Sequence, residues 1–230
     1  MSDDWIEHAS DGPSWQPPTP LPTLVTTART VVRRWNADDA LELFQTIDRS
    51  REAILPWMLW SATDHRRLEH TVYYIERFRR EAAKSSCTTF PMGIFDRDSG
   101  AVLGGTGLHD IAPLMRTAEV GWWLRPESRG QGLCREAVGG LMGQALRPVG
   151  EGGWGLHRVF AMVGVTNEAS QRVCERLGLR LEGRYRKERY LGYPPEDPPG
   201  WLDTLRYAVL AEEWGHELGR AACEPWPHDV

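Results

Sequence analysis

The sequence predicts an α+β fold with one mixed, mostly antiparallel central sheet flanked by helices. Three observations support this prediction. Two β-rich runs, "TTFPMGIFD" and "AVLGGTGLHDI", flank the turn "RDSG", which indicates an antiparallel hairpin. A strand, helix, strand, helix succession follows in the middle of the chain, and two more strand-like runs, "RLEGRYRKERYL" and "DTLRYAVL", come near its end. Together these patterns favour one sheet with helices packed against it.

The length and composition suit one folded domain with appended arms. The chain has 230 residues, of which 41% are hydrophobic, and single domains commonly reach about 200 residues. We predict a proline-rich arm over 1–24 that adds little to the core, a folded domain over 25–215 and a tail over 216–230. The arm contains "DGPSWQPPTPLPTL", where proline removes backbone donors and no apolar periodicity is seen.

Charge and cysteine usage exclude several classes of function. A formal net charge of -5 lacks the cationic field that general binding to nucleic-acid phosphates needs. We therefore expect no nucleic-acid partner. We expect no metal either, because the four cysteines stand far apart without a CxxC pair. With neither a signal sequence nor a long apolar run, the sequence predicts a cytoplasmic protein without a membrane partner.

Two helices are expected before the hairpin. "NADDALELFQTIDRS" predicts a helix with Asn36 as its N-cap and an interruption near Pro56. Its predicted apolar face holds Leu41, Phe44 and Ile47. The second, longer helix lies in "DHRRLEHTVYYIERFRREAAK", and its predicted apolar stripe holds Leu68, Val72, Ile75 and Phe78.

The remaining elements surround a glycine-rich stretch. "ARTVVRRW", "TAEVGWWL" and "HRVFAMVGV" are typical of strands. A helix is expected to run to about Leu146, where Pro148 stops it. The next helix is expected to start at an Asn167 cap and to end at Gly178, as a glycine after the last turn would end it.

The stretch "SRGQGLCREA" lies between a strand and a helix and has the glycine spacing of a phosphate-binding loop. A Walker loop is excluded, because Leu133 and Cys134 stand where Lys and Ser or Thr are needed. A dinucleotide loop is disfavoured, because Arg135 replaces its third glycine. Free amides at a helix N-terminus still favour an anion. The alternative is an ordinary tight turn between strand and helix.

The same stretch resembles the GNAT superfamily of acyl-CoA-dependent N-acyltransferases, whose loop reads Gln/Arg-x-x-Gly-x-Gly/Ala. In the run from Arg129 to Cys134, Arg129 and Gly132 occupy the first two fixed positions of that pattern, whereas Cys134 stands where the family has Gly or Ala. The segments "AEVGWWLRPESRGQGLCREAVGGLM", "LHRVFAMVGVTNEASQRVCERLGLRLEGRYRK" and "DTLRYAVL" are similar to the Rim-type branch, which acetylates protein N-termini and related small amines. The likeness runs from about Thr26 to Trp214 and implies the GNAT fold.

The resemblance implies acetyl-CoA as co-substrate, without a metal. The backbone of Leu124 would contact the pantetheine arm or the thioester carbonyl, and Asn167 would also contact the pantetheine. Ser170, three residues after Asn167, would protonate or hydrogen-bond the departing thiolate. The pyrophosphate would lie against the loop residues Arg129, Gly130, Gln131, Gly132, Leu133, Cys134 and Arg135.

The general base is left open between two carboxylates. By strand alternation Glu119 shares a face with Gly121 and Trp123 just before the loop. Glu188 lies near the place where the serine-acetylating branch keeps its base, but the match puts Arg189 at that place and Glu188 one residue early. A shift of one residue in a strand turns a side chain to the other face. Either carboxylate could instead be an ion-pair partner.

The acceptor is expected to lie near "AILPWMLW", which looks like a tryptophan-bearing stretch of ribosomal-protein serine N-acetyltransferases and of microcin C immunity acetyltransferases. Trp57 and Trp60 would then line the acceptor groove, with His109 as a further candidate for substrate contact or base; core packing is the alternative for both tryptophans. The expected acceptor is a protein or peptide N-terminus. A small-molecule amine, such as a polyamine, an antibiotic or an aminoacyl-nucleotide toxin, and a non-catalytic acyl-CoA sensor remain alternatives. The resemblance implies a monomer or homodimer.

Overall fold

The computed structural model describes residues 15–19, 21, 23–191, 200–215 and 222–224. These residues form a nine-stranded sheet in the order β7-β8-β6-β5-β4-β3-β2-β1-β9. Among the strand pairs, β5 and β6 run parallel and the others antiparallel, which confirms the predicted mixed, mostly antiparallel sheet. The strands are β1 Leu24–Thr26, β2 Thr30–Arg34, β3 Phe90–Asp96, β4 Val102–Ala112, β5 Thr117–Leu124, β6 Arg158–Gly164, β7 Arg180–Leu191, β8 Gly200–Leu210 and β9 Ala222–Glu224.

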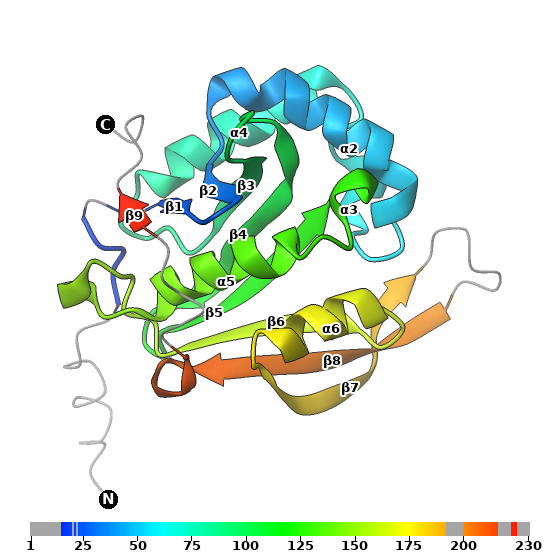
Figure 1. Ribbon diagram of the computed structural model, residues 1–230. Helices are drawn as coiled ribbons and strands as arrows, with labels where there is room; N and C mark the ends of the chain where they lie inside the picture. Colours follow the sequence, from blue (N-terminus) through cyan, green and yellow to red (C-terminus); the bar gives the residue numbers. More distant parts are fainter. Residues whose placement is uncertain (1–14, 20, 22, 192–199, 216–221, 225–230) are drawn as a thin grey trace, which may run out of the picture.

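Helices cover both faces of the sheet (Figure 1). Helices α2 and α4 pack against each other, and they contact β4 and β3, respectively. Helix α5 packs against β1, β2, β5, β6 and α6. The α-helices are α2 Ala40–Ile54, α3 Trp60–Thr63, α4 Leu68–Ala82, α5 Leu133–Leu146 and α6 Glu168–Arg176. Short 3-10 turns are η1 Ala37–Asp39, η2 Pro126–Ser128, η3 Val149–Glu151 and η4 Ala211–Glu213.

The predicted helix ends are confirmed, whereas the predicted start at Asn36 is a 3-10 turn that leads into α2. Asn36 caps η1 through its side chain, which accepts a hydrogen bond from the Asp39 amide at 3.2 Å. Helix α2 ends at Ile54, before Pro56, and α5 ends at Leu146, before Pro148. Gly178, just past α6, has a φ of +78°, a conformation that glycine adopts without a steric cost.

Two of the residues predicted for the apolar helix faces are wrong. Leu41 on α2 is 54% exposed, and the helix buries Ala40 and Leu43 together with the predicted Ile47. Val72 on α4 is 38% exposed, and Thr71 and Ile75 are the buried positions. In both helices the buried face includes a position with a small or polar residue, Ala40 or Thr71, which a count of large apolar residues overlooks.

The expectation that the proline-rich arm adds little to the core is also wrong. Trp15 is 7% exposed and belongs to the main cluster of buried hydrophobic residues. Its ring stacks on Trp154 with the ring centroids 6.4 Å apart, and its indole nitrogen donates to the Trp154 carbonyl at 2.6 Å. A chain segment that precedes the first strand therefore contributes to the packing near η3.

The feature that positions the site is a split in the middle of the sheet. Strands β5 and β6 pair only from Thr117 with Arg158 to Glu119 with Phe160. Beyond these pairs β5 continues to Leu124 and β6 to Gly164 without pairing to each other. The C-terminal half of β5 therefore has one paired edge, against β4, and one open edge.

Within the described residues, no helix is both long and apolar enough to cross a membrane.

Candidate active site

The split exposes backbone groups of β5. The Arg125 amide bonds the Leu103 carbonyl on β4, and the Gly121 carbonyl accepts from the Thr106 hydroxyl on the same strand. Because backbone groups alternate sides along a strand, Trp122 and Leu124 direct theirs away from β4 and toward the split. The Leu124 carbonyl accepts from the Arg129 guanidinium at 3.0 Å. The Leu124 amide is thus aimed at the space between the strands.

The glycine-rich loop after β5 is built for close backbone approach. Gly130 has a φ of +73° and Gly132 a φ of +79°, where a side chain would be strained. Gly132 is also the N-cap of α5, and its carbonyl receives the Glu136 amide at 3.1 Å. The amides of Leu133, Cys134 and Arg135 precede that first helical bond, so they remain open at the helix N-terminus, where an anion is favoured.

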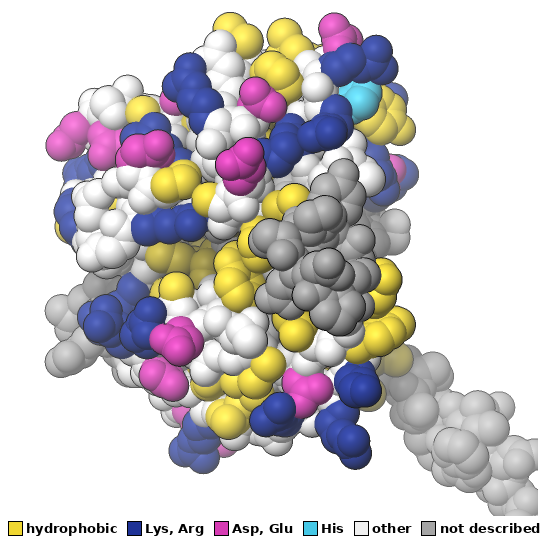
Figure 2. Space-filling model, turned by 90° about the vertical axis from the view of Figure 1, so that its right-hand side faces the viewer, with side chains coloured by type: hydrophobic (Ala, Val, Ile, Leu, Met, Phe, Trp, Pro, Cys, Tyr) yellow, Lys and Arg dark blue, Asp and Glu magenta, His cyan; other side chains and the backbone are white. Residues whose placement is uncertain are grey.

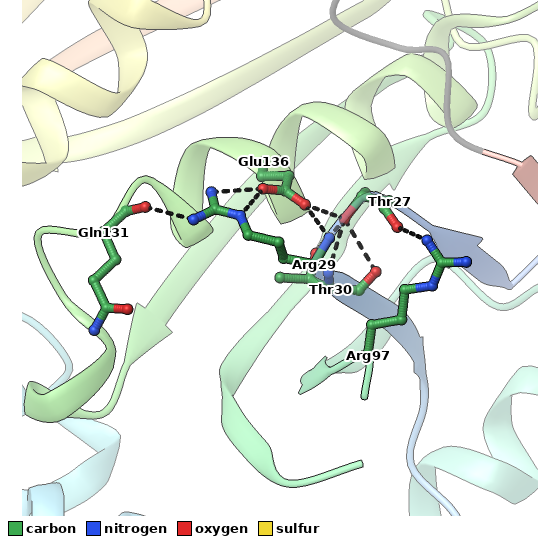
Figure 3. Close-up of polar contacts among 6 residues, drawn as sticks. All are labelled: Thr27, Arg29, Thr30, Arg97, Gln131 and Glu136. Carbon is green, nitrogen blue, oxygen red and sulfur yellow. Dashed lines mark hydrogen bonds and ion pairs between the residues drawn. The ribbon is translucent and has the colours of Figure 1, made fainter. Parts of the chain in front are cut away.

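An ion pair braces this loop from the side (Figure 3). Arg29, in the turn between β1 and β2, bonds Glu136 on the first turn of α5 at 2.7 Å and donates to the Gln131 carbonyl at 3.0 Å. Glu136 also accepts from the Arg29 amide at 2.6 Å and from the Thr27 hydroxyl at 2.7 Å. Burial alone would raise the pKa of Glu136, but these hydrogen bonds lower it overall. The carboxylate is therefore ionised and neutralised next to the loop.

A cavity of about 370 Å³, which we call the loop cavity, opens beside these amides. It extends from the loop past Leu124 to the start of α6. Its described lining contains no acidic side chain but includes the four arginines Arg129, Arg135, Arg172 and Arg176. Positive side chains and free amides converge there, so the loop cavity suits a polyanionic ligand.

Asn167 and Ser170 stand together at the start of α6. The Asn167 side chain caps the helix by accepting from the Ser170 amide at 3.1 Å, as the sequence predicts for an N-cap. Both residues line the loop cavity, and both also line a second cavity on the other side of the split. The Ser170 hydroxyl therefore lies where the two cavities meet.

The second cavity, which we call the aromatic cavity, has a volume of about 430 Å³. It lies between α2, α3, α4 and the sheet, and its lining includes Trp57, Trp60, His109 and Glu119. Figure 2 shows this side of the molecule, where hydrophobic side chains gather around a hollow and charged side chains flank it. The two cavities join at shared lining residues: Trp57, Met58, Trp122, Trp123, Asn167 and Ser170.

Glu119 and His109 face each other across β4 and β5 in the aromatic cavity. Burial, followed by the charge of Asp110, raises the pKa of Glu119. Burial also lowers the pKa of His109, against a smaller opposite effect of Asp110. The pair therefore offers a carboxylate that accepts a proton more readily than an exposed one and a neutral imidazole.

The two neighbouring candidates on β7 are placed differently. Glu188 lines neither cavity, although its charge contributes to the raised pKa of Glu119. Arg189 lines the aromatic cavity and donates to the Trp57 carbonyl at 2.8 Å. An irregularity between Tyr185 and Arg189, with Lys187 at a φ of +52°, sets which of the two faces the split. Of the predicted loop residues, Gln131 lies outside the lining and turns its side chain to the Glu127 carbonyl.

Several residues of the site were missed by sequence reasoning. Trp122 and Trp123 line both cavities, and the double tryptophan next to the glycine-rich loop could have indicated this. His65 and Tyr74 line the aromatic cavity from the loop after α3 and from α4. Nothing in the local sequence links these two residues to β5, because only the packing of helices on the sheet brings them there.

No metal centre is formed by the part of the chain that the structure describes: no group of three or more His, Cys, Asp or Glu side chains could hold an ion there. Cys134 lines the loop cavity, but burial raises its pKa to about 12. Its thiol is therefore protonated at neutral pH and a weak nucleophile.

Comparison with known proteins agrees with this geometry. The sequence model of the acetyltransferase (GNAT) domain matches residues 29–180, which include the split, the glycine-rich loop and α6. The chain belongs to the GNAT acetyltransferase family. This confirms the resemblance and the fold that the sequence predicted.

Several proteins similar to this GNAT chain carry ribosomal names. It is 25% identical over 186 residues to the putative ribosomal N-acetyltransferase YdaF of Bacillus subtilis, covering 81% of this chain and 93% of that one. The crystal structure of ribosomal-protein-S5-alanine acetyltransferase from Vibrio fischeri matches with a TM-score of 0.71 at 20% identity, over 84% and 99% of the two chains. Mycobacterium smegmatis RimJ in complex with CoA-disulfide matches with a TM-score of 0.69 at 23% identity, over 84% and 89%.

Proposed function

We propose that this GNAT acetyltransferase transfers an acetyl group from acetyl-CoA directly to a primary amine, and that the amine is the N-terminus of a protein or peptide. One observation carries the proposal: two cavities of different chemistry meet at Ser170. The loop cavity is lined by arginines and open amides, whereas the aromatic cavity contains the half-buried carboxylate of Glu119. The first suits the phosphates of CoA and the second suits an amine.

The loop cavity fits CoA in its charge and its backbone geometry. The amides of Leu133 to Arg135 would hold the pyrophosphate, and Gly130 and Gly132 allow close approach because they carry no side chain. The Leu124 amide would hydrogen-bond the pantetheine arm or the thioester carbonyl, and the Asn167 side chain would contact the arm. When bound, acetyl-CoA supplies an activated acetyl thioester. The relative RimJ, whose structure contains CoA-disulfide, has the same fold.

The residues at the junction can move the two protons that the reaction requires. Glu119, directly or through a water molecule, accepts the proton that the amine must lose, and its raised pKa suits a base that works near neutral pH. The amine nitrogen bonds the acetyl carbon while the carbon–sulfur bond breaks. Ser170 hydrogen-bonds or protonates the departing thiolate. Trp57, Trp60 and His109 would position the acceptor.

The names of the relatives favour a ribosomal protein as the source of the N-terminus. A small-molecule amine is the second candidate, and the aromatic cavity favours it, because its volume of about 430 Å³ lies in the range typical of small-ligand sites. We further propose that the protein acts in the cytoplasm, where ribosomal acceptors are found.

Thiol release from acetyl-CoA, measured with a panel of peptides and small amines, tests the proposal. We expect release that depends on an amine, together with CoA binding in calorimetry. Ser170→Ala should lower kcat about 10- to 1000-fold with little change in CoA affinity, because loss of a proton donor affects the transition state. Ser86→Ala, at an exposed position outside the lining of both cavities, is the matched control and should retain kcat.

Each other outcome has a meaning. Tight CoA binding without release for any amine would favour the acyl-CoA sensor over an enzyme. Equal kcat in Ser170→Ala and in the parent protein would remove Ser170 from the mechanism.

A further inference from the structure

We propose that the acceptor carries a large apolar side chain, aromatic or branched aliphatic, on the carbon that bears the reacting amine. The inference rests on the proposed function and concerns the aromatic cavity, which would hold that side chain. The preferred acceptor is then an N-terminal residue such as Phe or Leu rather than Ala, Ser or Lys. Three features of the cavity support this assignment.

The first feature is the depth of the cavity. Its lining includes Leu43 and Ile47 from α2 and Met92 from β3, which are 2%, 1% and 0% exposed. These residues belong to the buried core between the helices and the sheet. The cavity thus reaches from the junction at Ser170 into apolar surroundings, and its inner end suits a side chain that does not need water.

The second feature is a wall of aromatic rings that pack on one another. The Trp60 ring meets Trp123 edge to face at a centroid distance of 6.2 Å and meets His65 at 5.8 Å. His65 in turn meets Tyr74 at 4.8 Å, and Tyr74 meets Phe78 at 4.9 Å. Such a connected wall presents ring edges and faces to an aromatic or aliphatic occupant.

The wall is also fixed in place. Arg51 on α2 donates to the carbonyls of Ser61, Asp64 and His65, the last at 2.7 Å, and so holds the segment after α3. The His65 ring bonds the Thr71 hydroxyl at 2.9 Å, and burial lowers the pKa of His65 to about 4. The imidazole is therefore neutral and behaves as part of the apolar wall. A preformed site loses less affinity to ordering on binding.

The third feature is the floor of the cavity next to the reaction centre. Gly121 lies on β5 between Glu119 and Trp123, on the face that these residues share. A side-chain carbon placed on Gly121 would meet only the His109 ring, at 3.9 Å. The missing side chain leaves space beside the proposed base, where the side chain of the acceptor would pass toward the inner end.

The charges around the cavity argue against a second cationic group on the acceptor. Leu43, Ile47 and Met92 at the inner end carry no charge, so an extended ammonium chain would be desolvated there without a partner. Asp64, directly after α3, and Arg77, on α4, line the cavity from exposed positions. The arrangement therefore disfavours polyamines and lysine-like acceptors.

The experiment compares phenylalaninamide, leucinamide, alaninamide, serinamide and lysinamide as acceptors in the thiol-release assay. We expect kcat/KM for phenylalaninamide and leucinamide to exceed that for alaninamide by about 10- to 100-fold, because each buried methylene adds to binding. A second readout does not depend on activity. With CoA bound, N-acetylphenylalaninamide should quench the tryptophan fluorescence at lower concentration than N-acetylalaninamide.

Filling the floor provides the test by mutation. Gly121→Val should lower kcat/KM for phenylalaninamide at least about tenfold and should change kcat/KM for alaninamide much less, with CoA affinity retained. Gly183→Val is the matched control: Gly183 lies on β7, outside the lining of both cavities, and an added carbon would meet only Tyr185 at 3.6 Å. This variant should keep the preference of the parent protein.

The outcomes separate this inference from the function on which it rests. No thiol release with any amine would overturn the proposed function. Release with alaninamide, serinamide or lysinamide that equals or exceeds release with phenylalaninamide would overturn the inference alone. An unchanged preference in Gly121→Val would place the side chain of the acceptor outside the aromatic cavity and would also overturn it.

Discussion

Glu119 is a carboxylate that the fold keeps partly out of water, and its protonation should govern activity. Burial raises the pKa of this group above the usual value of 4.5. A base must be ionised, so kcat/KM should rise with pH through that raised pKa. Glu119→Gln should lower kcat/KM about 100- to 10 000-fold and remove this dependence. A pH profile of both proteins checks the prediction.

Glu119→Gln should lower activity, but it should not lower the stability of the folded protein. Since the folded-state pKa of Glu119 is raised, the ionised carboxylate disfavours folding, and stability is lost as pH increases through that pKa. Glu119→Gln should therefore unfold at the same or a higher urea concentration at pH 7. Glu188→Gln is the control for the neighbouring carboxylate. If kcat/KM lost its dependence on pH in Glu188→Gln and kept it in Glu119→Gln, the base would be Glu188 and not Glu119.

The ion pair between Arg29 and Glu136 leads to a prediction on CoA affinity. Arg29→Gln leaves the Glu136 carboxylate unpaired beside the loop, where its charge would repel a pyrophosphate and the Gln131 carbonyl loses its guanidinium donor. We expect the Kd for CoA to rise about tenfold, with kcat at saturation little changed. Calorimetry and steady-state kinetics measure the two effects.

A double variant identifies the cause. Arg29→Gln combined with Glu136→Gln removes the unpaired charge and should recover most of the affinity. Equal weakening in the single and double variants would instead mean that Arg29 contacts the ligand itself, and an unchanged Kd would contradict the bracing role.

The role of a single residue could be predicted from the sequence where its neighbours along the chain determine that role. Asn167, just before a helical pattern, was correctly predicted to be the N-cap of that helix. Gly130 and Gly132 correctly indicated a tight loop. Arg189 and Glu188 show the limit. The irregularity near Lys187 decides which of them faces the split, and a pattern that counts residues along a regular strand does not contain that irregularity.

Among the elements, the segment before β1 carries a stability prediction. Trp15→Ala would empty the space beside Trp154 and leave the Trp154 carbonyl without its indole donor. We expect a loss of about 3–5 kcal/mol in the free energy of unfolding, measured by urea denaturation. Trp15→Phe keeps a ring and should lose less. A change in Trp15→Ala below about 0.5 kcal/mol, typical of surface positions, would contradict the docking of this segment.

The elements also show which parts of the fold the sequence could predict. Strands and helix ends followed from alternation, capping and proline, which act within a few residues. The pairing of β9 with β1 could not be predicted, because Ala222–Glu224 is short and its partner lies at the other end of the chain. Leu24 and β9 lie outside the segment 25–215, and the domain boundaries remain a prediction.

For the whole molecule, the decisive feature is the single short parallel junction between β5 and β6. It joins two antiparallel parts of the sheet. One has the strand order β9-β1-β2-β3-β4-β5 and the other the order β6-β8-β7. The sequence predicted one mixed, mostly antiparallel sheet, including the hairpin of β3 and β4. It did not predict that β5 and β6 diverge after Glu119, because that depends on how α5 packs on both strands and α6 on β6, and residues of both helices line the loop cavity.

The split also determines how backbone hydrogens exchange with solvent. Amides of an inner strand usually exchange slowly, but here the amides of Gly121 and Trp123 are held by β4 while those of Trp122 and Leu124 face the opening. Deuterium labelling of the ligand-free protein, followed by NMR, should therefore show slow and fast exchange at alternate residues of β5. Addition of CoA should slow the fast pair selectively, so that one strand in the interior of the sheet reports occupancy residue by residue.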